Sequence, residues 1–316
     1  MTEEPKLSIV IPVFNEERNI RPLFDELQQA LKRLGMNWEI LWVDDGSSDA
    51  SQAAVESCSD GNARVLYFKL TRNFGQSAAL ACGFEHAQGD IVVTLDGDRQ
   101  NDPSAIAGLL AKLGEGFDVV CGWRRDRHDG LLRVWVSRLA NKMISAITRV
   151  PIHDYGCTLR AYRRAALKDF RMMGDMHRLL PAYLTWMGLK VTEMPVPHRP
   201  RTAGYSKYSI MTRLWKVVLD AFLLNFYFSY ITRPMHFFGM AGLGLLGIAF
   251  CLEAFVVFRR LAMGGDWLSP LFFLGLFLGC GALLFFFLGV MADLMARSFM
   301  AHQNYKSYHL ASKREL

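Results

Sequence analysis

The order of elements in the first 120 residues limits the possible folds more than any other feature of the sequence. Short apolar runs alternate there with polar loops and helical patterns. The apolar runs are residues 7–12, 38–43, 64–70, 91–95 and 117–121. Runs of this length that end in turn residues predict buried strands. The helical patterns between them predict parallel connections, so we expect a doubly wound, mainly parallel α/β sheet.

Polar side chains follow four of these predicted strands at the point where each strand ends. They are Asn15 and Glu16, Asp44 and Asp45, Asn73, and Asp96, in chain order. Because the carboxyl ends of parallel strands meet at one edge of a sheet, these loops are expected to share one crevice, where open α/β sheets bind ligands. Unrelated surface turns would not all fall at that edge.

The fourth strand runs directly into Asp96-Gly97-Asp98. Residues i and i+2 of an extended chain point the same way, so both carboxylates could bind one cation. Oxygen ligands favour Mg²⁺ or Mn²⁺, which commonly bridge to substrate phosphates. The alternative is a surface turn, since Asp-Gly-Asp is also good turn sequence. Taken alone the motif favours the turn, but its position among the other strand ends favours the metal site.

Two long apolar runs, residues 235–258 and 268–291, lie near the end of the chain. Each has 24 residues, or about 36 Å as a helix, which is enough to cross a bilayer. A short connection joins them, so we expect a transmembrane hairpin; two buried helices of a soluble protein are the less favoured alternative. Glu253 interrupts the first run and is expected to reach water at the far interface rather than to face the second helix.

Basic residues flank the hairpin unevenly, and the majority side is expected to be cytoplasmic. Arg259 and Arg260 lie in the short connection, whereas most flanking Lys and Arg residues lie on the other side. The first residues contain no apolar signal sequence, so the large N-terminal part is expected to stay in the cytoplasm. Both termini are then cytoplasmic. The six cysteines are scattered and resemble buried, reduced side chains.

The chain carries 36 basic and 30 acidic residues, a net charge of +6. A basic excess beside predicted membrane segments favours anionic lipid as the partner. No recognisable nucleic-acid motif accompanies it, so no nucleic acid is expected. Residues 209–232 predict an amphipathic helix at the membrane surface. Residues 131–148 fit either such a helix or one packed on the sheet.

A glycine pattern inside the first apolar run, Gly242-x-Gly-x-x-Gly247, matches dinucleotide-binding sites. It lies within a predicted membrane helix instead of between a strand and a helix, so we interpret it as close helix packing. Gly275-x-x-x-Gly279 is expected to serve the same purpose. The expected parts are a catalytic domain (1–208), a juxtamembrane helix (209–232), a hairpin (233–296) and a cytoplasmic tail (297–316).

The chain resembles the family 2 glycosyltransferases with the GT-A fold in four motifs: Pro12-Val-Phe-Asn-Glu16, Asp44-Asp-Gly-Ser47, Arg72-Asn-Phe-Gly75 and Asp96-x-Asp98-x-Gln100. Two more, Asp154-Tyr-Gly-Cys-Thr-Leu-Arg160 and Gly204-Tyr-Ser-Lys207, are similar to the polyprenyl-phosphate sugar transferases, which include dolichol-phosphate mannose synthase and the GtrB-type and ArnC-type enzymes. The resemblance covers roughly residues 6–300. The sequence departs from the group at Arg99, where the group commonly has Leu, and at residues 101–103.

The resemblance implies a GT-A (Rossmann-like) domain and a role for each matching residue. The metal ligands would be Asp96, Asp98 and Gln100, binding Mg²⁺ or Mn²⁺. The donor-binding residues would be Pro12, Phe14, Glu16, Asp44, Asp45, Asn73, Gly75, Gln76 and Asp96, with Arg201 and Lys207 closing over the diphosphate. The acceptor phosphate would contact Arg124, Arg127, Arg133 and Ser137. The catalytic residues would be Asp96, Asp98 and Asp154.

Two roles remain open at this point. Asp154 either orients an acceptor-side arginine or serves as a base. Asp44 either binds the donor or caps a helix; Asp45 beside it could form the cap while Asp44 binds. Each of the arginines, taken singly, is more often a solvated surface residue.

The implied reaction moves a sugar from a nucleotide diphosphate, expected to be UDP, to undecaprenyl or another polyprenyl phosphate with inversion. The expected partners are the nucleotide sugar, the polyprenyl phosphate, the bilayer of a bacterial inner membrane and a second copy of the chain through the hairpin. One alternative is a glycosyltransferase with a hydroxyl acceptor, whose usual Gln-x-x-Arg-Trp motif is absent. The other is a non-catalytic membrane scaffold, against which the intact Asp96 and Asp98 argue.

Overall fold

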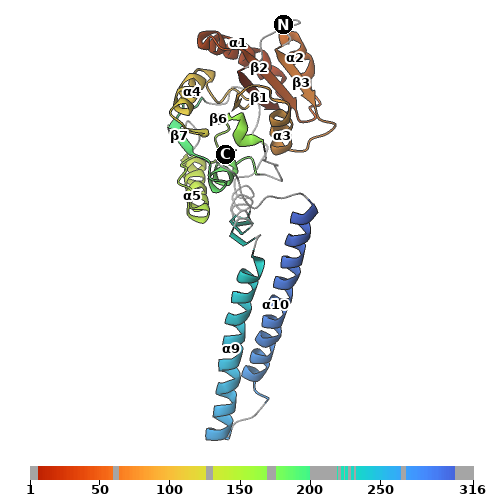
Figure 1. The fold of residues 1–316 in the computed structure, drawn as a ribbon, viewed down its shortest axis with the longest axis vertical. Coiled ribbons are helices and arrows are strands. Elements are labelled where there is room, and N and C mark those ends of the chain that lie inside the picture. Colours follow the sequence, from red (N-terminus) through yellow and green to blue (C-terminus); the bar gives the residue numbers. More distant parts are fainter. Residues whose placement is uncertain are drawn as a thin grey trace, which may run out of the picture. The chain divides into compact units, whose positions relative to one another are not determined.

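The structure is a computed structural model of the 316-residue chain. It describes residues 6–59, 64–125, 131–168, 176–199, 219, 222–223, 225–226, 229–230, 233–264 and 268–302, without the side chains of 131–133 and 299–302. The chain divides into two units, residues 1–224 and 225–316 (Figure 1).

The first unit is built on a seven-stranded sheet with the order β3-β2-β1-β4-β6-β5-β7. The strands are β1 (Leu7–Val13), β2 (Trp38–Asp44), β3 (Val65–Lys69), β4 (Ile91–Thr94), β5 (Val119–Trp123), β6 (Arg160–Arg163) and β7 (Val191–Pro195). All neighbours pair in parallel except β6, which is antiparallel to both β4 and β5. The mainly parallel sheet predicted from the sequence is confirmed, and β6 is the exception.

Helices cover both faces of this sheet, as in a doubly wound fold. They are α1 (Glu17–Leu34), α2 (Ser51–Ser59), α3 (Gln76–His86), the 3₁₀ turn η1 (Pro103–Ala105), α4 (Ile106–Gly114), α5 (Leu131–Thr148), α6 (Arg164–Leu167) and α7 (Leu180–Trp186). Side chains of α1, α2 and α4 form one core with the sheet, and those of α3, α6 and α7 form the other. Because a core packs on each face of the sheet, the loops at the carboxyl ends of the parallel strands lie along one edge of it.

Helix α1 shows how local sequence sets these boundaries. Its apolar face is buried, including Ile20, Leu23 and Leu27 at helical spacing. The helix ends at Gly35, whose φ of 62° lies in the left-handed region that glycine adopts without a Cβ clash. The first strand continues one residue beyond the predicted Pro12 and ends at Val13.

The second unit contains α9 (Pro234–Met263) and α10 (Pro270–His302). Both are long and apolar enough to cross a membrane, and both exceed the lengths expected from the sequence. The helices run antiparallel, because Gly289 of α10 packs against Met235 near the start of α9, whereas Gly275 packs against Glu253 further along it. These contacts support the expected hairpin.

The glycine positions in this hairpin divide into two kinds. A Cβ on Gly242 would lie 3.2 Å from the carbonyl oxygen of Ala282, so the helices do pack closely there. Nothing lies within 4 Å of such a Cβ at Gly244, Gly247 or Gly279, so the expected packing role is wrong for those three residues. Glu253 lies against Gly275 of the partner helix, so the expectation that it avoids α10 is also wrong. Its carboxyl group occupies the space that a side chain at position 275 would need.

Candidate active site

The carboxylates of Asp96 and Asp98 lie just beyond the end of β4. Asp96 Oδ1 accepts a hydrogen bond from Gln76 Nε2 at 2.7 Å, and its Oδ2 accepts one from Thr158 Oγ1 at 2.5 Å. Asp98 is buried, and its Oδ1 accepts a bond from the backbone N of Gln100 at 3.1 Å. The two carboxylates are therefore held at the carboxyl edge of the sheet, where the strand pattern predicted them.

Gly97 allows β4 to end against β1. A Cβ at this position would lie 2.8 Å from Val13 Cγ1 and 3.3 Å from the carbonyl oxygen of Pro12. Any larger residue would push the two strand ends apart. The contact places the predicted donor residue Pro12 beside the metal motif.

The electrostatics of the pair suit a bound cation. Burial raises the pKa of Asp96, and the nearby charge of Asp98 raises it further, to about 6. Two adjacent carboxylates that repel each other in this way bind a hard divalent cation well, and the Gln100 amide supplies a further oxygen. Among the described residues no group of three His, Cys, Asp or Glu side chains forms a metal cluster. The residues present thus fit a cation held by Asp96, Asp98 and Gln100, with substrate or water completing its shell.

Asp44 and Asp45, at the end of β2, have different partners. Asp44 is fully buried, and its oxygens accept bonds from the backbone N of Ser47 at 2.7 Å and from Tyr67 Oη at 2.5 Å. Asp45 accepts bonds from the backbone N atoms of Phe74 and Gly75 at 2.7 and 2.9 Å. Asp44 therefore closes its own turn, while Asp45 holds the loop after β3.

Gly46 brings these two loops into contact. It has a φ of 77°, and a Cβ there would lie 2.5 Å from the carbonyl carbon of Arg72. The loop contains Asn73 and the exposed Phe74, whose ring lies 4.1 Å from the Arg72 guanidinium carbon. The predicted donor residues Asn73 and Gly75 lie on this loop, and Gln76, the first residue of α3, reaches Asp96.

The loop after β1 is tied to the loop after β2. Asn15 Oδ1 accepts a bond from the backbone N of Ser48 at 2.8 Å, and Ser47 Oγ accepts one from the backbone N of Asn15. Glu16 bonds through its backbone N to Ser51 Oγ at 3.0 Å. Phe14 directly precedes Asn15 and Glu16 in the chain and is partly exposed. The structure therefore brings the predicted donor residues of the first three strand ends together.

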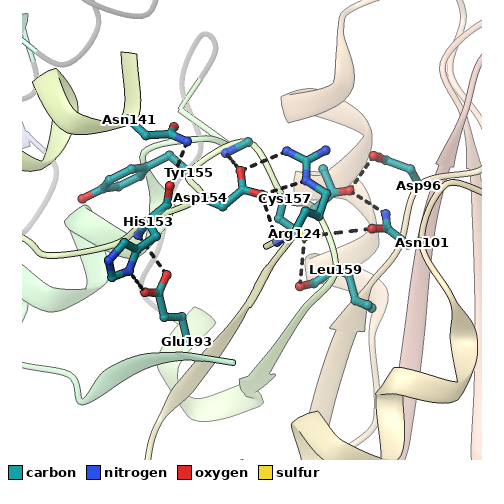
Figure 2. Close-up of polar contacts among 12 residues, drawn as sticks. Asp96, Asn101, Arg124, Asn141, His153, Asp154, Tyr155, Cys157, Leu159 and Glu193 are labelled. Carbon is teal, nitrogen blue, oxygen red and sulfur yellow. Dashed lines mark hydrogen bonds and ion pairs between the residues drawn. The ribbon is translucent and has the colours of Figure 1, made fainter. Parts of the chain in front are cut away.

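Arg124 and Asp154 form an ion pair beyond the end of β5. The Nε and Nη2 atoms of Arg124 donate to the two oxygens of Asp154 at 2.8 and 2.9 Å. Burial lowers the pKa of Arg124, but the bonds to Asp154 raise it by more, so the guanidinium keeps its charge. In Figure 2 this pair lies between Asp96 on one side and His153 on the other. Of the two roles left open for Asp154, this geometry favours orienting the arginine.

Two residues near this pair were missed by sequence reasoning. His153 Nδ1 pairs with Glu193 of β7, and its carbonyl accepts a bond from Asn141 of α5 (Figure 2). Its ring stacks on Trp123. Thr158 donates to Asp96, and its carbonyl accepts a bond from Thr94. Thr158 falls within the motif at residues 154–160, and that motif could have identified it. No sequence feature could have identified His153, because its partners come from three other segments of the chain.

The remaining predicted residues are only partly placed. Arg127, Arg201 and Lys207 lie outside the described residues. Arg133 is described only as part of the α5 backbone, and Ser137 is partly buried on the same helix. The arrangement of the acceptor arginines beyond Arg124 therefore stays a prediction.

Comparison with known proteins agrees with this geometry. A family model described as "Glycosyl transferase family 2" matches residues 8–171. A dodecaprenyl-phosphate galacturonate synthase from Rhizobium johnstonii is 37% identical over 300 residues, covering 93% of this chain and 88% of the relative. An undecaprenyl-phosphate 4-deoxy-4-formamido-L-arabinose transferase from Salmonella paratyphi B is 37% identical over 285 residues, covering 90% and 84%.

Solved structures show the same fold. Glucosyl-3-phosphoglycerate synthase from Mycobacterium tuberculosis, in complex with Mn²⁺, UDP-glucose and phosphoglyceric acid, superposes with a TM-score of 0.56 at 18% identity and covers 70% of this chain and 79% of that one. At that identity the likeness concerns the fold alone. The family model and the two relatives establish more: the chain belongs to the family 2 glycosyltransferases.

Proposed function

We propose that this glycosyltransferase moves a sugar from a nucleotide diphosphate to a polyprenyl phosphate at a bacterial inner membrane, using a divalent cation and inverting the anomeric centre. One observation carries the proposal: the Asp96–Asp98 pair and the buried Arg124–Asp154 pair lie beside each other at one edge of the sheet. An edge with both features has a place for a cation and diphosphate and a place for a second phosphate.

The donor side of the site is negatively charged and ordered. When bound, the cation acts as a Lewis acid on the leaving diphosphate. The residues that would hold it are Asp96, Asp98 and Gln100. The loops beside them are held by hydrogen bonds that Asn15 and Asp45 accept from neighbouring loops. UDP is the expected nucleotide, in line with the UDP-glucose complex of the fold relative.

The acceptor side of the site needs a positively charged side chain more than it needs a general base. A phosphate monoester is already largely ionised at neutral pH, since its second pKa is about 6, and its own oxygen can attack the sugar carbon. Arg124 keeps its charge in the ion pair with Asp154 and can present unused N–H groups of its guanidinium to that phosphate. A single displacement by this oxygen inverts the sugar carbon.

Helix α5 supplies a surface suited to lipid headgroups. Trp135, Leu139 and Met143 recur every four residues and are exposed, with Trp135 at 73%. Arg138 and Lys142 lie on the same helix, and a basic and aromatic face of this kind favours the bilayer interface. We include α5, the hairpin of α9 and α10, and cytoplasmic termini in the proposed membrane arrangement. The divisions at residues 208, 232 and 296 belong to the same proposal.

The experiment is a transfer assay with the purified full chain in lipid nanodiscs. Labelled UDP- and GDP-sugars, including nucleotide-linked galacturonate and 4-formamido-arabinose, are offered with undecaprenyl phosphate and either Mn²⁺ or EDTA. We expect butanol-extractable labelled lipid from one donor only when Mn²⁺ is present. Label in a lipid or glycan through a hydroxyl would favour the alternative transferase, and no transfer from any donor would falsify the proposal.

A further inference from the structure

Glu26 lies in the middle of α1, away from the contacts described so far. Its two carboxylate oxygens accept hydrogen bonds from two arginines far apart in the sequence. Arg99 Nη2 donates to Oε1 at 2.6 Å, and Arg199 Nη1 donates to Oε2 at 2.6 Å. The Nη2 atom of Arg199 also donates to Asp102 at 2.7 Å. Glu26 therefore joins two guanidinium groups, and the four side chains alternate in charge.

This network encloses the loop that carries two of the proposed metal ligands. Arg99 directly follows Asp98, and Asp102 ends the loop where η1 begins. The backbone N of Arg199 donates to the carbonyl oxygen of Gln100 at 2.9 Å. The loop is therefore held on both sides of Gln100, by side chains at residues 99 and 102 and by a backbone bond between them.

The backbone at Arg99 needs such support. Its φ of 61° lies in the left-handed region, which residues other than glycine rarely adopt. A conformation of this kind persists only where surrounding contacts hold it. The bond from Arg99 to Glu26 is one such contact, and it acts on the residue next to Asp98. Loss of this bond would free the loop to turn differently after Asp98.

We propose that Glu26 is a positioning residue for the cation site. Through Arg99 and Arg199 it fixes the loop so that Asp98 and Gln100 present their oxygens to one divalent cation. Asp102 completes the network from the other end of the loop. This inference rests on the proposed function and adds to it a residue on a helix that none of the sequence motifs includes.

A purely structural role makes a different prediction. The side chains of Glu26, Arg99 and Arg199 are 25%, 27% and 40% exposed. Partly exposed ion pairs contribute little to stability, so a structural role predicts a small change in unfolding temperature and no change in cation affinity. A positioning role predicts that cation affinity falls while the unfolding temperature of the cation-free protein hardly moves.

The test measures Mn²⁺ binding directly, by the electron paramagnetic resonance signal of free Mn²⁺ over the full-length protein in nanodiscs with UDP present. The variants are Glu26→Gln, Arg99→Gln and the double substitution. We expect Glu26→Gln to weaken Mn²⁺ binding by about tenfold, the lower end for loss of a residue that orients a metal ligand. The double variant should bind no more weakly than the weaker single variant, since both break the same bond.

Asp25→Asn is the matched control. Asp25 is the neighbouring acid on α1 and pairs with Arg21 at 3.2 Å, outside the site. It should bind Mn²⁺ like the wild type, whereas Asp98→Asn should lose binding. Unfolding temperatures in EDTA show whether each variant is folded.

The outcomes separate this inference from the proposed function. Wild-type affinity in Glu26→Gln, equal loss in Asp25→Asn, or additive losses in the double variant would overturn the role of Glu26 and leave the proposed function standing. A wild-type protein that binds no Mn²⁺ with UDP overturns the cation site itself and the positioning role with it.

Discussion

Arg124 binds both oxygens of the Asp154 carboxylate, and its Nε and Nη2 atoms each lie within 2.9 Å of a different oxygen (Figure 2). The backbone N atoms of Arg124 and Gly156 also donate to Asp154. A carboxylate whose two oxygens already accept these bonds is poorly placed to take a proton from a substrate. The arginine, in contrast, gains a fixed position and a retained charge, which is what recognition of a phosphate requires.

Replacement of Asp154 by Asn should therefore damage both stability and acceptor binding. The side chains of Arg124 and Asp154 are 14% and 4% exposed, and breaking a buried pair by removing one partner costs about 3–5 kcal/mol. We expect a clear fall in unfolding temperature and a larger rise in KM for polyprenyl phosphate than for the donor. Asp293→Asn, which breaks an exposed pair with Arg297, is the control and should change little. A loss in kcat with an altered pH profile and an unchanged acceptor KM would instead indicate a base.

Cation binding should weaken in acid because of Asp96. The pKa of Asp96 is about 6 in the folded protein, which is higher than the pKa of the same carboxyl group in the unfolded chain. At a pH between these two values, the folded protein therefore holds a proton that the unfolded chain has released. Ionisation of Asp96 thus lowers the stability of the cation-free protein as pH rises from about 4 to about 6. Below pH 6, Mn²⁺ must displace that proton, so its apparent affinity should fall by up to about tenfold per pH unit. Calorimetric titrations between pH 5 and 7.5 test this, and a flat profile contradicts it.

Asp45→Ala should weaken donor binding without large effects on the chemical step. Asp45 holds the backbone N atoms of Phe74 and Gly75, and hydrogen bonds to a charged group are worth about 1.5–3 kcal/mol each. The freed loop carries Gln76 away from Asp96, so we expect KM for the nucleotide sugar to rise about tenfold, or about 1.4 kcal/mol. Asp49→Ala, which loses bonds from the backbone N atoms of Ser51 and Glu17 but none to the loop after β3, should have a smaller effect. Equal effects of the two substitutions would remove the special role of Asp45.

Charged residues on α5 should uncouple the enzyme from its membrane substrate. The double substitution Trp135→Glu and Leu139→Glu places two acids on the exposed apolar face. We expect slower transfer to undecaprenyl phosphate in vesicles with anionic lipid, and normal transfer to a short, water-soluble prenyl phosphate. Arg18→Glu on α1 changes the net charge by the same amount and serves as the control. Equal loss with both acceptors would mean that α5 is part of the fold and not a membrane contact.

Much of the fold follows from local sequence. The buried strands and the face of α1 with Ile20, Leu23 and Leu27 were predictable, because burial imposes a period of two or 3.6 on apolar residues. The antiparallel β6 was not, since its four residues carry no direction in their pattern. Its pairing depends on where the distant β4 and β5 lie.

The sequence by itself determined that carboxylates end a buried strand and that two helices can span a bilayer, because both are properties of a continuous segment. Only the tertiary structure decided what those carboxylates touch. Thr158 on Asp96, Asp154 on Arg124, and Glu26 between Arg99 and Arg199 are contacts between segments up to 173 residues apart. Hydrogen bonds of this kind depend on direction and distance in space, and the spacing of residues along a chain does not specify either.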